Sequence, residues 1–308
     1  MKPNCPHFDC PSTKNPGPIS GHVIGFGSFR RSSDSRWIKR YLCKACGRHF
    51  SRATLSPNYL QKKRRINSPL HQLISSGVSQ RRAALLLKVN RKTIVRRFRF
   101  LAEQARIRHR EFLNDHSRVP IQEIEFDDLE TAEHTKCKPL SVSLAVDPKC
   151  RKILDFQVSR MPAKGHLSRI AFKKYGYRKD ERKEGWERLF QNLKAHTTEH
   201  VILKSDENPH YPKFIKKHFP TATHLSFLGA RGSISGGGEL KRIGKDPLFA
   251  LNHTCAMLRA NLNRLFRRTW CTTKTIPGLI DHLSIYVDYH NRILTPASSH
   301  LPTLKGAS

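Results

Sequence analysis

Glu125-Phe126-Asp127-Asp128 closes an apolar segment, residues 121–128, that decides how the larger part of this chain is interpreted. The composition of the segment is typical of a β-strand, and the strand ends in two acids. A second short apolar run, residues 201–204, leads directly into Asp206. Acids in these positions are either solvated strand ends or carboxylates that meet in the folded sheet and share a cation.

The segments around these two strands follow a definite order along the chain. Residues 141–146 and 152–158 are expected to form a hairpin. The predicted elements after it are a helix at 186–194, the strand at 201–204, a helix at 211–218, a strand at 223–227, a Gly-rich loop at 229–238, a long helix from Asp246-Pro247 to about residue 268, and a final helix at 276–289. This order predicts the α/β class, with a ribonuclease-H-like mixed sheet and helices on its faces. In such a sheet Asp127 and Asp206 meet at the centre, where carboxylates bind Mg²⁺ or Mn²⁺ for phosphodiester chemistry.

The net charge of the chain indicates what kind of partner it has. Among 308 residues, 57 Lys and Arg outnumber 24 Asp and Glu, so the formal net charge is +33. Such a charge predicts a polyanionic partner, and nucleic acid is the expected one. The longest purely apolar run, residues 83–87, is far shorter than a membrane span of roughly 18 residues, so no membrane partner is expected. The N-terminus lacks the apolar core of a secretory signal, which predicts an intracellular protein.

Four of the eight cysteines form two closely spaced pairs, Cys5-x4-Cys10 and Cys43-x2-Cys46. Two such pairs are typical of four thiolates around one tetrahedral Zn²⁺. The intervening residues 22–41 suggest two short strands around a Ser-rich turn, so the pattern predicts a zinc ribbon over residues 1–60 that folds around the metal. His7 or His49 can replace one thiol, and four unrelated buried cysteines are the alternative without a metal.

Residues 61–112 predict a second small module. Ser79 is suited to cap a helix, and Lys88-Val89-Asn90 makes a short turn before a basic helix with apolar residues at helical spacing. This succession is typical of a helix-turn-helix, although a plain three-helix bundle has the same periodicity. DNA contacts are expected from basic side chains of the last helix, namely Arg91, Lys92, Arg96 and Arg97. Residues 113–120 are the predicted linker to the α/β domain at residues 121–300.

A zinc ribbon, a helix-turn-helix and an acid-bearing sheet, in this order, resemble the bacterial insertion-sequence DDE transposases of the IS-one-like kind over about residues 5–292. The stretches that carry the resemblance are Glu125-Phe126-Asp127-Asp128, Leu203-Lys204-Ser205-Asp206, residues 258–265 and residues 286–292. The resemblance implies that Asp127 and Asp206 are the first two catalytic acids and that Arg259 contacts transposon-end DNA. It further implies a homo-oligomer on double-stranded DNA, in the bacterial cytoplasm at the nucleoid. Such an enzyme binds the terminal inverted repeats of its element, cleaves there and joins the strands to a target.

At the third position of this family's motif the sequence departs from the pattern. Counting seven residues back from Arg259, where the family usually has Glu, reaches Asn252. An amide oxygen ligates Mg²⁺ without charge, and Asn252 is favoured as third ligand over Glu239, a carboxylate after the glycine run. If the asparagine marks lost catalysis, the protein is instead a domesticated, sequence-specific DNA-binding regulator on the same scaffold.

Overall fold

A computed structural model describes the chain except for residues 1–2, 15–21, 117–118, 229–245, 267–269 and 296–308. The chain divides into two compact units, Met1–Ile66 and Asn67–Ser308. The segment predicted as a helix-turn-helix therefore shares one unit with the α/β segment. Among the described helices, none is both long enough and apolar enough to cross a membrane.

The first unit is a small antiparallel sheet with the strand order β1-β2-β3. Its elements are α1 (Pro11–Lys14), β1 (Val23–Arg30), β2 (Trp37–Cys43), β3 (His49–Ser51) and the 3-10 turn η1 (Arg64–Ile66). The predicted hairpin around the Ser-rich turn is confirmed, and Arg31 closes that turn by donating from Nε to Asp34 Oδ1 at 2.7 Å.

The second unit begins with three helices, α2 (Asn67–Ile74), α3 (Gln80–Leu86) and α4 (Arg91–His116). The predicted cap at Ser79 is confirmed, because its hydroxyl accepts from the backbone N–H of Arg82 at 3.2 Å. Asn90 does the same for α4, accepting from the N–H of Lys92 at 2.8 Å. Helix α4 continues to His116, so the start of the predicted linker at 113–120 is helical in the structure.

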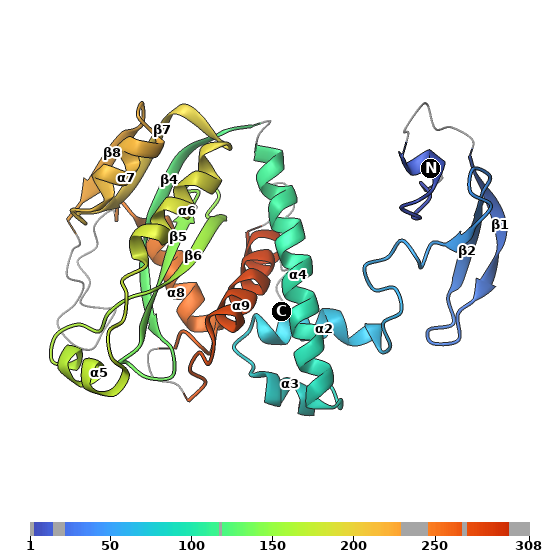
Figure 1. Ribbon diagram of the computed structural model, residues 1–308, viewed down its shortest axis with the longest axis horizontal. Helices are drawn as coiled ribbons and strands as arrows, with labels where there is room; N and C mark the ends of the chain where they lie inside the picture. Colours follow the sequence, from blue (N-terminus) through green and yellow to red (C-terminus); the bar gives the residue numbers. More distant parts are fainter. Residues whose placement is uncertain (1–2, 15–21, 117–118, 229–245, 267–269, 296–308) are drawn as a thin grey trace, which may run out of the picture. The chain divides into compact units, whose positions relative to one another are not determined.

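A mixed five-stranded sheet follows, with the order β6-β5-β4-β7-β8 (Figure 1). Its strands are β4 (Ile121–Ala132), β5 (Pro139–Val146), β6 (Ile153–Arg160), β7 (Thr197–Asp206) and β8 (Thr223–Phe227). Strands β4, β5 and β6 pair antiparallel, whereas β7 and β8 run parallel to β4. The predicted α/β class with a mixed sheet is therefore confirmed.

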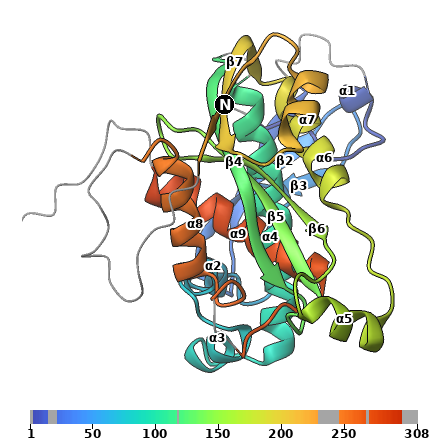
Figure 2. The same cartoon turned by 90° about the vertical axis from the view of Figure 1, so that its left-hand side faces the viewer.

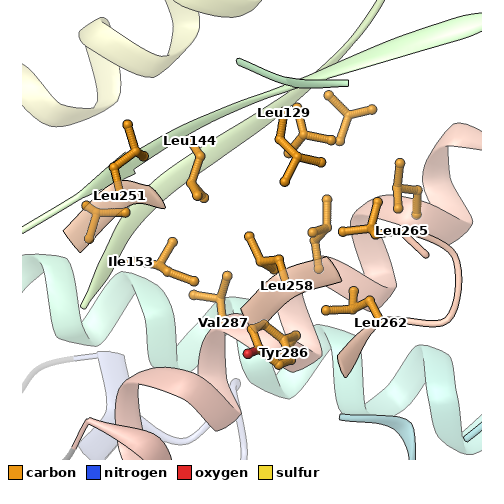
Figure 3. Close-up of a cluster of buried hydrophobic side chains, with 14 of the residues drawn as sticks. Leu129, Leu144, Ile153, Leu251, Leu258, Leu262, Leu265, Tyr286 and Val287 are labelled. Carbon is orange, nitrogen blue, oxygen red and sulfur yellow. The ribbon is translucent and has the colours of Figure 1, made fainter. Parts of the chain in front are cut away.

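Helices cover both faces of this sheet. On one face, α6 (Arg182–Lys194) and α7 (Tyr211–His218) pack with Phe126 in an aromatic core. On the other face, α8 (Phe249–Asn261) and α9 (Ile276–Tyr289) contribute Leu258 and Val287, which pack against Leu144 and Ile153 (Figure 3). Successive β4 residues face opposite sides because side chains alternate along a strand, so Phe126 and Leu129 belong to different cores.

Other elements also differ from the sequence-based expectation. Strand β4 does not end at Asp127 and Asp128 but continues to Ala132, because residues 129–132 go on pairing with β5. Helix α5 (Leu167–Tyr175) was not predicted. Helix α8 begins at Phe249 rather than at Asp246-Pro247, because Asp246 Oδ1 accepts from the N–H of Leu248 in a turn before the helix. It ends at Asn261 rather than near residue 268, because Leu262 has an extended backbone (φ −104°, ψ 109°).

Helix α9 joins the three-helix segment to the sheet by running beside α4 (Figure 2). Asp288 of α9 is 4% exposed and accepts a bidentate pair from Arg108 of α4 at 2.7 and 2.9 Å. His71 of α2 contacts the same carboxylate at 3.0 Å. After α9 the described chain ends in a short π-helical segment, η3 (His290–Leu294).

Candidate functional site

Four cysteine thiols converge in the first unit. The Sγ atoms of Cys5 and Cys46 are 3.8 Å apart, and those of Cys10 and Cys43 are 3.6 Å apart. All four lie within 4.8 Å of one another. A tetrahedral ion with Zn–S bonds near 2.3 Å separates its sulfur ligands by about 3.8 Å. The cluster therefore has the spacing of a structural zinc site and can hold a metal ion.

Local turns position the two cysteine pairs. Cys43 ends β2, and the turn after it brings the N–H of Gly47 to the Cys43 carbonyl at 2.8 Å, with Gly47 at φ +68°. Such a backbone angle suits glycine, which has no Cβ. In the other turn, the backbone N–H of Cys10 donates a hydrogen bond to the carbonyl oxygen of His7 at 3.1 Å. An ion pair between Arg48 and Asp9, at 2.6 Å, ties the two turns together.

The histidine alternatives lie outside this thiol group. The four-cysteine group needs neither His7 nor His49 to complete a tetrahedral set. The ring of His49 packs instead on Phe26, with centroids 4.3 Å apart. A hydrogen bond from Ser12 is the main reason why the pKa of Cys10 is lowered to about 6, whereas burial raises the pKa of Cys5 to about 12, so without a metal Cys10 ionises more readily than Cys5.

Two acids converge in the second unit, at the neighbouring parallel strands β4 and β7. The two strands pair in register up to Glu125 and Lys204, and Asp127 and Asp206 each follow two residues later. Burial, and next to it the charge of Asp206, raises the pKa of Asp127 to about 7. The structure thus brings together the two acids that the sequence singled out, although they are far apart along the chain.

Hydrogen bonds orient Asp127. Its Oδ1 accepts from the N–H of Asp128 at 2.6 Å and, at the longer distance of 3.5 Å, from the hydroxyl of Tyr211. The side chain of Asp128 lies on the opposite face of the sheet. There it accepts from Ser143 at 2.6 Å and from the indole N–H of Trp186 at 3.0 Å. The Asp128 carboxylate is therefore hydrogen-bonded within the aromatic core, on the opposite side of β4 from the Asp127 carboxylate.

A third acid of β4, Glu125, positions helix α8. Its side chain is 3% exposed, and Oε2 accepts from the backbone N–H of Leu251 at 2.8 Å, in the first turn of the helix. Burial raises the pKa of Glu125, and the Leu251 N–H partly offsets this. The contact anchors the start of α8 to the strand that carries Asp127. Sequence reasoning missed this role, because no local signal relates Glu125 to a helix more than a hundred residues away.

One face of α8 borders the acid pair. Asn252, Cys255 and Arg259 share this face through their i, i+3 and i+7 spacing. Burial, followed by the charge of Asp127, raises the pKa of the Cys255 thiol to about 12, so Cys255 lies near Asp127. The sequence carried no signal for this thiol.

The third-ligand candidates do not complete the site within the described structure. The exposed side chain of Asn252 donates from Nδ2 to Asp246 Oδ2 at 2.9 Å. Among the described residues, no hydrogen bond links Asn252 to Asp127 or Asp206, and no third carboxylate joins the pair. Glu239 lies outside the described residues.

The basic residues predicted to contact DNA lie on two helices. Arg91, Lys92 and Arg96 are exposed near the start of α4, whereas Arg97 is half-buried and burial lowers its pKa. Arg259 of α8 is also half-buried and lines a cleft of about 750 Å³.

Comparison with models of known protein families and with curated proteins finds no match to this chain. Function is therefore inferred from the α/β fold, the cysteine cluster and the acid pair themselves.

Proposed function

We propose that this protein is a DDE-type transposase that binds the terminal inverted repeats of its own element and catalyses strand cleavage and strand transfer. In this proposal the α/β unit is a ribonuclease-H-like catalytic domain, and helices α2 to α4 form a helix-turn-helix. The four-cysteine cluster is a structural zinc ribbon. The protein acts as a homo-oligomer on double-stranded DNA in the bacterial cytoplasm, at the nucleoid.

The juxtaposition of Asp127 and Asp206 is the observation that carries this proposal. Both acids follow paired positions of adjacent parallel strands, and burial, followed by the charge of Asp206, raises the pKa of Asp127. Two converging carboxylates disfavour each other's ionisation unless a cation compensates them. The strand order β6-β5-β4-β7-β8, with one strand pairing antiparallel and one parallel to β4, is also the order expected of a ribonuclease-H-like sheet.

The residues present suit a divalent cation. Asp127 and Asp206 would hold Mg²⁺ or Mn²⁺, hard ions that take carboxylate oxygens. Such ions promote phosphodiester cleavage by activating the attacking oxygen and stabilising the leaving one. The chain itself contributes the orientation of the acids: the Asp128 N–H and the Tyr211 hydroxyl hold Oδ1 of Asp127, and Glu125 anchors the helix that borders the site.

Charge supports DNA as the substrate. The chain carries a net charge of +33, and the exposed cations at the start of α4 are suited to the base and phosphate contacts of a recognition helix. Arg259 shares a helix face with Cys255, beside the acid pair, which suits a contact to the DNA strand that is cut.

A nicking assay on a duplex from the flanks of its own gene tests this function. We expect Mg²⁺-dependent nicking by the wild type and none by Asp206→Asn, which keeps the size of the side chain and removes its charge. Glu207→Gln, a matched change at the exposed neighbouring acid, should retain nicking. Cleavage by Asp206→Asn at the wild-type rate would refute the assignment.

A second candidate is a catalytically inactive DNA-binding regulator on the same scaffold. It is favoured by the hydrogen bond of Asn252 to Asp246, which leaves two carboxylates among the described residues where the resembling family has three. Specific binding of the flanking duplex without nicking in either Mg²⁺ or Mn²⁺ identifies the regulator.

A further inference from the structure

A small pocket lies between the helix-turn-helix segment and the connection from α8 to α9. Its volume is about 220 Å³, several times the roughly 30 Å³ that one water molecule occupies. It opens beside the start of α3, the start of α4 and the residues that precede α9. Its polar lining includes Ser79, Gln80, Arg91, Arg264, Thr272 and Lys274.

The lining of this pocket is positively charged. Arg91, Arg264 and Lys274 contribute three cations, and no carboxylate is among the described lining residues. The ammonium of Lys274 donates to the hydroxyl of Thr272 at 3.0 Å, which orients it beside the pocket. Within the described parts of the chain, none of the three cations forms an ion pair.

Arg264 is the most informative of the three cations. Its guanidinium lies over the ring of Phe98, 6.0 Å from the centroid, and burial lowers its pKa. The charge of Asp281 partly offsets this lowering of the Arg264 pKa, but the Asp281 carboxylate accepts its hydrogen bond from Arg106, at 2.7 Å. A half-buried charge that has no hydrogen-bonded acceptor among the described residues is costly, and an anion in the pocket would compensate it.

We propose that this pocket binds a phosphate group. Guanidinium groups donate paired hydrogen bonds to phosphate oxygens, and an ammonium adds a point charge, so this set of cations is suited to an oxyanion. Because Arg91 stands at the start of α4, the expected source is a backbone phosphate of the duplex at the helix-turn-helix; this choice of source rests on the proposed function. The other source is a free phosphate ester.

Duplex binding as a function of salt tests the DNA source. A random 30-base-pair duplex suffices, since phosphate contacts are independent of sequence. Arg264→Gln and Lys274→Gln should each lower the magnitude of the slope of log K against log salt, and the double variant should lower it by up to about 0.9, the contribution of one phosphate. Each should also weaken binding about tenfold near 0.15 M salt. Arg264→Lys keeps the charge and should keep the slope. If Arg264→Gln does not fold, Lys274→Gln still tests the proposal, because Lys274 is exposed and its replacement does not disturb the core.

Inorganic phosphate tests the pocket without DNA. It should raise the melting temperature of the wild type more than that of Arg264→Gln or Lys274→Gln, with Lys173→Gln on α5 as a matched control that behaves like the wild type. Stabilisation by phosphate with unchanged duplex slopes supports the pocket and identifies a free phosphate ester as its ligand. Unchanged slopes together with equal phosphate effects in all variants would overturn the proposal. If the wild type does not nick DNA but the variants do change the salt slope, the transposase proposal is refuted and the phosphate-site proposal is supported.

Discussion

Asp127 and Asp206 follow paired positions of the adjacent parallel strands β4 and β7, and the charge of one raises the pKa of the other. Burial is the largest cause of that rise, followed by the charge of Asp206. A divalent cation bound by the two acids, as proposed above, would displace the proton that this raised pKa retains.

The first prediction concerns the pH dependence of stability in a chelator. Burial and Asp206 raise the pKa of Asp127 from 3.8 to about 7 in the folded state, so its protonated form stabilises the fold at low pH. This stabilisation, up to about 4 kcal/mol, is lost as the pH rises from 4 to 7. Melting curves of Asp127→Asn should lack this loss, whereas Asp115→Asn, at an exposed position of α4, should behave like the wild type. Equal pH profiles for Asp127→Asn and the wild type would contradict the assignment.

The second prediction concerns the thiol cluster. Purified protein should carry about one zinc ion, and Cys43→Ser should release it, because a tetrahedral site with one ligand removed binds far more weakly. Cys271→Ser, at an exposed position outside the cluster, should keep the metal. Zinc analysis of the two variants checks this, and full retention by Cys43→Ser would exclude the site.

The third prediction concerns the α4–α9 junction. Although burial by itself raises the pKa of Asp288, hydrogen bonds from His71 and Arg108 hold that pKa well below its ordinary value. Asp288→Asn should cost about 1.5–3 kcal/mol at neutral pH, because it removes the buried, charged acceptor of the hydrogen bonds from Arg108 and His71. The stabilisation is present above about pH 4 and is lost as the pH falls below it. Asp281→Asn removes a more exposed pair with Arg106 and should cost about 1 kcal/mol or less. Denaturant unfolding measures the loss of unfolding free energy in each variant. Equal losses in the two variants would show that the contacts of Asp288 do not stabilise the packing of α4 on α9 as expected.

The fourth prediction concerns the third ligand. Asn252→Ala should lose nicking at ordinary Mg²⁺ concentrations, whereas Glu239→Ala should keep most of it. Asp246→Asn serves as a control for the hydrogen bond that holds the Asn252 amide, and it should change the Mg²⁺ concentration required rather than abolish nicking. A dead Glu239→Ala protein beside an active Asn252→Ala protein would make Glu239 the ligand.

The fifth prediction concerns recognition by α4. Replacing Lys92 and Arg96 by Gln should weaken binding to the flanks of the gene more than binding to random duplex, because base contacts carry specificity, whereas Arg91 lines the proposed phosphate pocket. Competition binding at fixed salt measures the ratio. An equal loss on both duplexes shows that these residues contact phosphates alone.

Local chemistry in the sequence determined most elements of the fold. Ser79 caps α3 as expected, since a hydroxyl at that position satisfies a backbone N–H whatever the rest of the chain does. The two cysteine pairs likewise predicted the thiol cluster, because the short spacing within each pair brings thiols together at one turn. The apolar runs before Asp127 and Asp206 predicted strands, and the α/β class followed from the order of such runs.

Only the tertiary structure decided which of these residues meet. Register brings Asp127 beside Asp206 and turns Asp128 to the opposite face, although the two neighbouring acids are alike in the sequence. It also places Glu125 at the start of α8, and it ends that helix at Asn261, earlier than its apolar pattern suggested. Propensity, capping and spacing act over a few residues, whereas register, burial and the charge on a neighbouring strand depend on which distant segments pack together.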